Sequence, residues 1–267
     1  MAGRIGELFG RLSGRGERAL ITYVMAGYPD HDSSMAAVRG LVRGGADLIE
    51  LGFPFSDPLA DGPVIQDAAT TSLGMGMSMG TYHGMVRGIR EYADTPVVMM
   101  TYANIAHSMG YGRFASESAQ AGVDGFILPD MPVEESGDYT REARRNGTDT
   151  IFLVSPNTPA RRVSRIARAS TGFLYMVAVY GTTGARGGVS GDAIDSLRRT
   201  KEAAGDLPVG VGFGVAGPRD VRRYAEAGAD GIIVGSAILR VVGESPRGDI
   251  ESRVAEFVAS LKAQTIL

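Results

Sequence analysis

The sequence predicts an α/β protein, a single (β/α)8 TIM barrel over residues 1–267 with an extra N-terminal helix. Three observations favour this fold. Apolar, strand-like runs alternate with helix-like segments along the chain, as in proteins with a parallel sheet. Eight such pairs can be counted. The 267 residues, 44% of them hydrophobic, suit either one barrel domain or two small ones, and eight strand–helix units at this length favour one closed barrel over a doubly wound sheet.

The predicted strands are short apolar runs, spaced about 20 to 30 residues apart. They are residues 20–26, 48–52, 96–102, 125–129, 150–154, 173–179, 209–214 and 231–235. The helices expected between and after them are residues 33–43, 82–92, 114–121, 139–145, 161–169, 193–203, 219–227 and 250–262. A further helix at residues 5–12 precedes the first strand, and we expect it to close the bottom of the barrel.

Three turns share one pattern, which indicates a repeated structural unit. Residues 44–47, 121–124 and 227–230 each place a glycine, a small or apolar residue and an aspartate between a helix and the next strand. Glycine commonly ends a helix in the left-handed conformation. These glycines are therefore interpreted as helix caps and not as ligand contacts.

Composition excludes several classes of function. The net charge is −3, and the paired arginines at 161–162, 198–199 and 222–223 are expected on solvated helix faces, so no nucleic-acid partner is indicated. The chain has no cysteine and only three, widely spaced histidines, which argues against disulfides and a metal site. With neither a secretory signal nor a long apolar run, we expect a cytoplasmic protein that has no contact with a membrane.

Glu50 is the first candidate for chemistry. It lies in a predicted strand that is apolar on both faces, where it shares a face with Leu48 and Gly52. A carboxyl in such a setting tends to have a raised pKa and can hold a proton near neutral pH. The alternative is a structural carboxylate paired with an arginine.

A phosphate site is expected where the last strands end. In barrels of this kind the active site lies at the carboxyl ends of the strands, and the loops after the seventh and eighth often bind phosphate through backbone N–H groups. Gly214, Gly235 and Ser236 fall at those ends, and Gly184 follows the sixth strand. Ser236 would add a hydroxyl donor and cap the next helix. Each glycine taken alone would also fit a tight turn.

The run IELGFPFSDPLADGP at residues 49–63 closely resembles the signature of the tryptophan synthase alpha chain family, the indole-3-glycerol-phosphate lyases. The resemblance continues at residues 103–104, 130–135, 181–184, 212–214 and 235–237, so it covers nearly the whole chain. It implies that the chain cleaves indole-3-glycerol phosphate by a retro-aldol reaction to indole and glyceraldehyde 3-phosphate, without a metal or an organic cofactor of its own.

The resemblance identifies Glu50 and Asp61 as the catalytic acids. Glu50 would move a proton between indole C3 and a glycerol hydroxyl, while an ionised Asp61, in a wetter loop, would accept a hydrogen bond from the indole N–H. Without the surrounding motif, Asp61 would be interpreted as a turn residue without a catalytic role, because Asp-Gly is a common pair in turns.

The family's matching positions for an apolar indole slot are Tyr23, Ile65, Met100, Tyr175 and Phe213, although each would also suit the barrel core. Thr183 lies in a stretch that resembles the family's mobile lid, in which it would meet Asp61. The lid differs from the usual pattern at residues 178–180. Tyr102 and Asn104 are expected only to hold the loop after the third strand.

The resemblance also implies a partner. The family works with a beta chain that condenses indole with serine on pyridoxal phosphate (PLP), so we expect an alpha2-beta2 tetramer in which the PLP belongs to the beta chain. In the family the loop after the second strand lies on the side that meets this partner, so the resemblance implies that Asp57 and Pro58 face the beta chain.

Two other functions remain open at this point. One is another phosphate-binding barrel enzyme, such as an isomerase or aldolase; a Schiff-base aldolase would need a lysine at a strand end, whereas Lys201 and Lys262 fall in predicted helices. The other is a silent regulatory subunit, which retention of both acids argues against.

Overall fold

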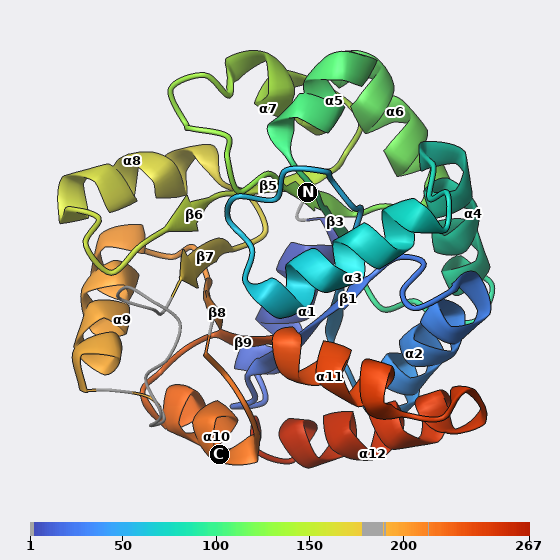
Figure 1. Cartoon of the computed structure of the whole chain (residues 1–267). Helices are drawn as coiled ribbons and strands as arrows, with labels where there is room; N and C mark the ends of the chain where they lie inside the picture. Colours follow the sequence, from blue (N-terminus) through green and yellow to red (C-terminus); the bar gives the residue numbers. More distant parts are fainter. Residues whose placement is uncertain (1–2, 178–188, 190, 213) are drawn as a thin grey trace.

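The computed structural model describes residues 3–177, 189, 191–212 and 214–267. Its strands lie at the centre, and its helices surround them (Figure 1). Every strand pair in the described residues is parallel. The predicted (β/α)8 barrel is confirmed.

In the described part of the chain the sheet has nine strands, one more than predicted. They are β1 (Ala19–Met25), β2 (Leu48–Gly52), β3 (Val97–Met100), β4 (Gly125–Ile127), β5 (Asp149–Ile151), β6 (Leu153–Val154), β7 (Leu174–Val177), β8 (Val209–Gly212) and β9 (Gly231–Val234). The spatial order is β5-β4-β3-β2-β1-β9-β8-β7-β6.

The additional strand arises because the predicted strand 150–154 is divided at Phe152. Its first half, β5, pairs with β4, and its second half, β6, pairs with β7. The two ends of the strand order are thus consecutive in the chain. One barrel position therefore contributes two short strands, and the barrel is nearly closed.

Helices that the sequence predicted recur with small shifts in their ends. They are α1 (Arg4–Ser13), α2 (His31–Arg43), α4 (Met79–Arg90), α6 (Tyr111–Ala121), α7 (Gly137–Arg145), α8 (Ala160–Ala169), α9 (Gly191–Ala204), α10 (Pro218–Glu226) and α12 (Ile250–Lys262), with a short 3-10 turn η1 (Arg247–Asp249) before the last. Three helices lie where the strand–helix count had placed none: α3 (Pro63–Gly74), α5 (Ala103–Met109) and α11 (Ser236–Glu244).

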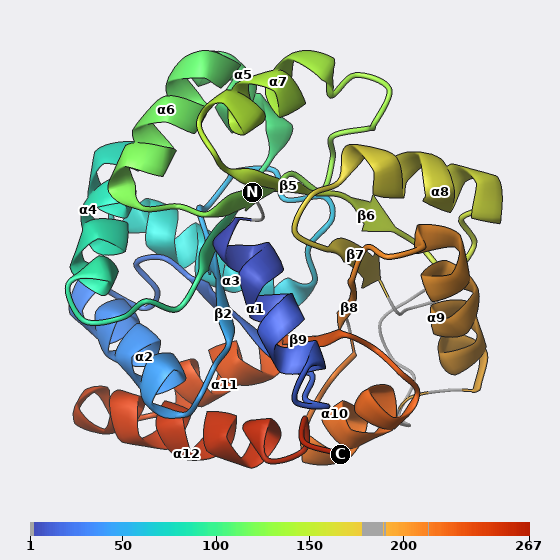
Figure 2. The same cartoon turned by 180° about the vertical axis from the view of Figure 1, so that it is seen from behind.

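Two hydrophobic layers hold the barrel together. The inner layer joins the inward side chains of the strands to α1, whose Ile5, Leu8, Phe9 and Leu12 are all buried against them. Figure 2 shows α1 lying across the end of the barrel opposite to the view in Figure 1. The expected closure of the barrel bottom by this helix is confirmed. The outer layer lies between the strands and the surrounding helices.

The repeated turns form the structural unit that their sequences indicated. Gly45, Gly122 and Gly228 have φ angles of 89°, 104° and 93°, the left-handed conformation that glycine adopts without steric cost. The helix-cap interpretation is confirmed at all three.

The aspartates of these turns join neighbouring strands. Asp47, Asp124 and Asp230 each accept a hydrogen bond, of 2.7 to 2.8 Å, from the backbone N–H of a residue at the start of the adjacent strand, and each also pairs with a cation. The cations at Asp230 and Asp47 are Lys201 and Lys262, both at 2.7 to 2.8 Å. These lysines are thus used to stabilise the entry edge of the barrel, opposite to the carboxyl ends of the strands.

Candidate active site

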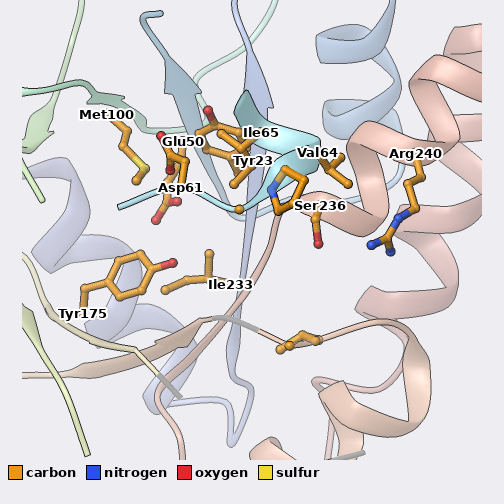
Figure 3. Close-up of a pocket in the computed structure, with 15 residues that line it drawn as sticks. Tyr23, Glu50, Asp61, Val64, Ile65, Met100, Tyr175, Ile233, Ser236 and Arg240 are labelled. Atoms are coloured by element: carbon orange, nitrogen blue, oxygen red, sulfur yellow. The ribbon is translucent and has the colours of Figure 1, made fainter. Parts of the chain in front are cut away.

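A cavity of about 830 Å³, counting the solvent space at its mouth, opens at the carboxyl ends of the strands. The sequence-predicted site residues that the structure describes, the two interface residues apart, all line it: Tyr23, Glu50, Asp61, Ile65, Met100, Tyr175, Gly214, Gly235 and Ser236. Phe213, Thr183 and Gly184 lie outside the described residues. In Figure 3 the two acids and Tyr175 gather away from Ser236 and Arg240. The part of the cavity lined by Ser236 and by Gly214 and Gly235, which follow the neighbouring strands β8 and β9, is called its glycine-rich end.

Glu50 is a buried acid that pairs with no cation of the described residues. Its side chain enters the cavity from β2, in register with Tyr23 of β1 and Val98 of β3, and the residue is only 1% exposed. Oε1 has no hydrogen-bond partner among the described residues. Burial alone raises the pKa of Glu50 to about 8. The carboxyl is therefore mostly protonated at neutral pH, and the alternative of a structural ion pair with arginine is excluded among the described residues.

Two glycines at strand ends make room for tyrosines beside this acid. A Cβ on Gly52 would collide with the Tyr23 hydroxyl, and a Cβ on Gly212 would collide with the Tyr175 hydroxyl. Burial, with the charges of Asp61 and Glu50 as lesser causes, raises the pKa of both tyrosines well above the ordinary range. Both hydroxyls therefore stay neutral. The Tyr23 hydroxyl donates to Met25 Sδ at 3.9 Å, whereas the Tyr175 hydroxyl points into the cavity and can act as a hydrogen-bond donor there (Figure 3).

Asp61 is held by a residue that the sequence reasoning did not assign to the site. The Tyr102 hydroxyl donates to Asp61 Oδ2 at 3.0 Å and accepts from the backbone N–H of Ala60, also at 3.0 Å. Tyr102 therefore joins the end of β3 to the loop after β2, which corrects the expectation that it only holds its own loop. Partial burial raises the pKa of Asp61 to about 6, and the Tyr102 hydrogen bond opposes that rise. Asp61 is less wet than expected but still mostly ionised at neutral pH.

The glycine-rich end offers free backbone donors. Gly214 has a φ of 75°, and α11 begins directly after Gly235. The first backbone bond of this helix runs from the Leu239 N–H to the Gly235 carbonyl at 3.0 Å, which leaves the N–H groups before Leu239 without an intrahelical partner. Such an end attracts anions.

The expectation that Ser236 caps α11 is wrong. Ser236 is the first residue of the helix, and the capping position is held by Gly235, which has no side chain to accept a bond. Glycine at that position leaves the first N–H groups of α11 available to a ligand.

Besides Gly62 and Pro63, which belong to the run at residues 49–63, four further cavity residues were missed from the sequence: Val64, Val215, Ile233 and Arg240. The three apolar ones look like ordinary core in the sequence. Arg240 could have been predicted from its spacing. It follows Ser236 by four residues, and residues at that spacing share a helix face.

The loop after β2 is partly shaped by its own side chains. Ser56 Oγ donates to Asp57 Oδ2 at 2.7 Å, and the Leu59 N–H donates to the Asp57 carbonyl at 2.9 Å. Asp57 is exposed, Pro58 is half-buried, and Leu59 is 94% exposed. A large apolar side chain is thus presented to solvent beside the two residues predicted to face a partner.

No group of three or more His, Cys, Asp or Glu side chains among the described residues is placed to hold a metal ion. None of the helices in this part of the chain combines the length and apolar character needed to cross a membrane.

Comparison with known proteins decides the family. The sequence model described as "Tryptophan synthase alpha chain" matches residues 9–265. The chain belongs to the tryptophan synthase alpha chain family. A tryptophan synthase alpha chain from Halorhodospira halophila is 44% identical over 264 residues, covering 97% of this chain and 95% of the relative. The alpha chain from Methanosarcina mazei is 42% identical over 260 residues, covering 97% and 93%.

Solved structures agree. A chain of Mycobacterium tuberculosis tryptophan synthase superposes with a TM-score of 0.91 at 36% identity, covering all of both chains. A chain of the Pyrococcus furiosus tryptophan synthase a2b2 complex superposes with a TM-score of 0.86 at 39% identity, covering 92% of this chain and 98% of that one. As a tryptophan synthase alpha chain, this protein is a carbon-carbon lyase of tryptophan biosynthesis that cleaves indole-3-glycerol phosphate to indole and glyceraldehyde 3-phosphate.

Proposed function

We propose that Glu50 and Asp61 perform the acid-base chemistry of this alpha reaction within one domain formed by residues 1–267. The observation that carries the proposal is the buried Glu50 carboxyl. It faces the cavity with no cationic partner in the part of the chain that the structure describes, and its pKa is raised to about 8. A carboxylic acid that stays protonated at neutral pH can act as a general acid.

Glu50 gives its proton to C3 of the indole ring, which turns the ring into a leaving group. The resulting carboxylate then takes the proton of the glycerol hydroxyl next to the breaking bond. As the carbon-carbon bond breaks, its electron pair returns to the ring, and the hydroxyl carbon becomes the aldehyde of glyceraldehyde 3-phosphate. Glu50 ends the cycle protonated, so no cofactor is required in this chain.

Asp61 accepts a hydrogen bond from the indole N–H and stabilises the positive charge that C3 protonation places on the ring. Its pKa of about 6 keeps it ionised at neutral pH, as this role requires. Two carboxyls in one cavity thus hold different protonation states, because Glu50 is the more deeply buried and Asp61 receives a hydrogen bond from Tyr102.

The two ends of the cavity suggest where the indole ring and the phosphate of the substrate bind. The indole ring lies among apolar side chains near the acids, and the phosphate lies at the glycine-rich end. The apolar side chains proposed to hold the ring are those of Tyr23, Ile65, Met100, Tyr175 and Phe213. Gly184, Gly214, Gly235 and Ser236 are the proposed phosphate contacts, and Thr183 is the proposed lid contact of Asp61.

Asp61→Asn tests the second acid. Removing the charge is expected to lower kcat for indole-3-glycerol phosphate roughly tenfold to a hundredfold, because the developing charge loses its ionic acceptor. The cleavage rate of the full chain is measured with and without a tryptophan synthase beta chain. Asp67→Asn is the matched control, since Asp67 is exposed on α3 and does not line the cavity. A variant with wild-type kcat in both assays would contradict this role.

Tyr102→Phe tests how Asp61 is kept ionised. The Tyr102 hydrogen bond stabilises the carboxylate, so its loss is expected to raise the pKa of Asp61. The acidic fall of kcat/KM, near pH 6 in the wild type, should move up by about one pH unit. Tyr139→Phe serves as the control, because among the described residues its hydroxyl bonds only a backbone carbonyl of β4. Equal pH profiles in all three proteins would show that Tyr102 does not tune Asp61.

The partner is proposed to be a tryptophan synthase beta chain in an alpha2-beta2 tetramer, with PLP bound by the beta chain. The Pyrococcus furiosus relative comes from an a2b2 complex. Asp57, Pro58 and the exposed Leu59 are proposed to face this partner, because an apolar side chain in a shaped loop suits a protein contact. A cytoplasmic location is proposed with this biosynthetic role.

Neither competing function gains support. A Schiff-base aldolase needs a lysine in the cavity, but Lys201 and Lys262 are bound to Asp230 and Asp47 at the entry edge of the barrel. A silent regulatory subunit would have no need for a buried, unpaired acid, which is costly to keep. Cleavage of indole-3-glycerol phosphate by the isolated chain would exclude silence.

A further inference from the structure

We propose that Arg240 binds the substrate phosphate. Its positive charge adds to the uncharged donors that Gly214, Gly235 and Ser236 offer. This inference rests on the proposed function and extends it to a residue outside the glycine-rich motifs. The supporting observations are the position of Arg240, the charge distribution of the cavity and the absence of any other partner for its guanidinium group among the described residues.

The position is set by α11. Arg240 follows Ser236 by four residues, so the two side chains lie on the same face of the helix, one turn apart. Both line the cavity, and Figure 3 shows the Ser236 hydroxyl and the Arg240 guanidinium pointing to the same side of α11. The arginine side chain can therefore reach a phosphate bound at the N-terminal end of this helix.

The charge distribution of the cavity favours a cation at this end. Arg240 is the single basic side chain among the described residues that line the cavity, whereas Glu50 and Asp61 are both acids. A substrate phosphate carries close to two negative charges, and an ionised Asp61 repels it. Arg240 offsets that repulsion at the end of the cavity away from the acids, and so favours the orientation that brings the indole ring to Glu50.

The guanidinium is also available. Arg240 is exposed and makes no ion pair or hydrogen bond with the described residues, unlike Arg90, whose side chain bonds Asp124 and two backbone carbonyls. Binding a phosphate therefore breaks no existing contact. Arginine suits the task because its planar group donates two parallel hydrogen bonds to phosphate oxygens.

Arg240→Gln is expected to raise KM for indole-3-glycerol phosphate about tenfold and to leave kcat within about twofold, because phosphate binding is equal in the ground and transition states. Arg240→Lys, which keeps the charge but loses the paired geometry, should raise KM by less. The full chain is assayed with a saturating tryptophan synthase beta chain at low ionic strength. Added salt should weaken substrate binding more in the wild type than in Arg240→Gln.

Inorganic phosphate and a dephosphorylated substrate separate a ligand contact from a structural effect. Phosphate should compete with the substrate, with an inhibition constant about tenfold higher in Arg240→Gln. Indole glycerol, which lacks the phosphate, should be cleaved equally by the wild type and the variant. Arg11→Gln is the matched control: Arg11 is exposed on α1 at the opposite end of the barrel and should change none of these values.

Two results would overturn the inference. The first leaves the proposed phosphate site in place, and the second contradicts that site as well. If phosphate competes in the wild type but KM and the inhibition constant are unchanged in Arg240→Gln, Arg240 plays no part and the proposed phosphate site stands. If phosphate does not compete in the wild type and indole glycerol is cleaved as well as the phosphorylated substrate, the phosphate end of the proposed function fails as well.

Discussion

Glu50→Gln is expected to lower kcat for indole-3-glycerol phosphate about a thousandfold, with little change in KM. Glutamine has the shape of the protonated carboxyl and can donate a hydrogen bond, but it cannot transfer a proton to indole C3. The cavity around Glu50 is shaped by Tyr23, Tyr175 and the glycines beneath them, and none of these is altered. The variant therefore isolates proton transfer from binding.

The measurement is cleavage of indole-3-glycerol phosphate by the full chain, saturated with a tryptophan synthase beta chain. Glu91→Gln, an exposed residue at the end of α4, makes the same chemical change far from the cavity and should retain the wild-type rate. If Glu50→Gln keeps more than about a tenth of the wild-type kcat, Glu50 is not the proton donor, because positioned acid-base catalysis contributes at least a hundredfold.

The same variant is expected to be more stable than the wild type at pH 8, by on the order of 4 kcal/mol in the free energy of unfolding. In the unfolded chain Glu50 ionises near its ordinary pKa of 4.5, whereas in the folded protein it ionises near 8. Between these values the folded state binds the extra proton, so rising pH favours unfolding. The stability that the wild type has while Glu50 is protonated is therefore fully present below pH 4.5, and it is lost as the pH rises to about 8.

Urea unfolding at pH 5 and pH 8 measures this effect. The advantage of Glu50→Gln over the wild type should shrink to about 1 kcal/mol at pH 5, because at that pH the carboxyl is close to neutral in both states. Glu91→Gln should show the same stability difference at both pH values. A pH-independent difference for Glu50→Gln would mean that the folded pKa is ordinary, and the proposed general acid would then be ionised at neutral pH.

Together the two results would show that the active site is a source of instability. An unpaired carboxyl in the barrel interior costs folding free energy at neutral pH, and that cost is the condition for holding a proton there. Asp61 differs from Glu50, because its hydrogen bond from Tyr102 keeps it ionised at a smaller cost in folding free energy.

Most of the barrel could be predicted from the sequence because its strands are apolar on both faces and its helix ends carry glycine signals. The differences between the predicted and the observed elements have causes that lie far apart in the chain. The division of the fifth strand at Phe152 depends on pairing with two different neighbours, β4 and β7, which no local pattern encodes. Helices α3 and α11 contact β1 and each other, so tertiary packing decides their positions.

The sequence by itself determined the succession of strands and helices, the family motif at residues 49–63 and the two acids, since each depends on residues close together in the chain. Only the tertiary structure decided that Tyr102 of the β3 end would reach Asp61, and that Arg240 would line the same cavity as Glu50. Those residues are separated by 41 and 190 positions, and only closure of the barrel brings the strand ends around one space. The burial that raises the pKa of Glu50 comes from that same closure.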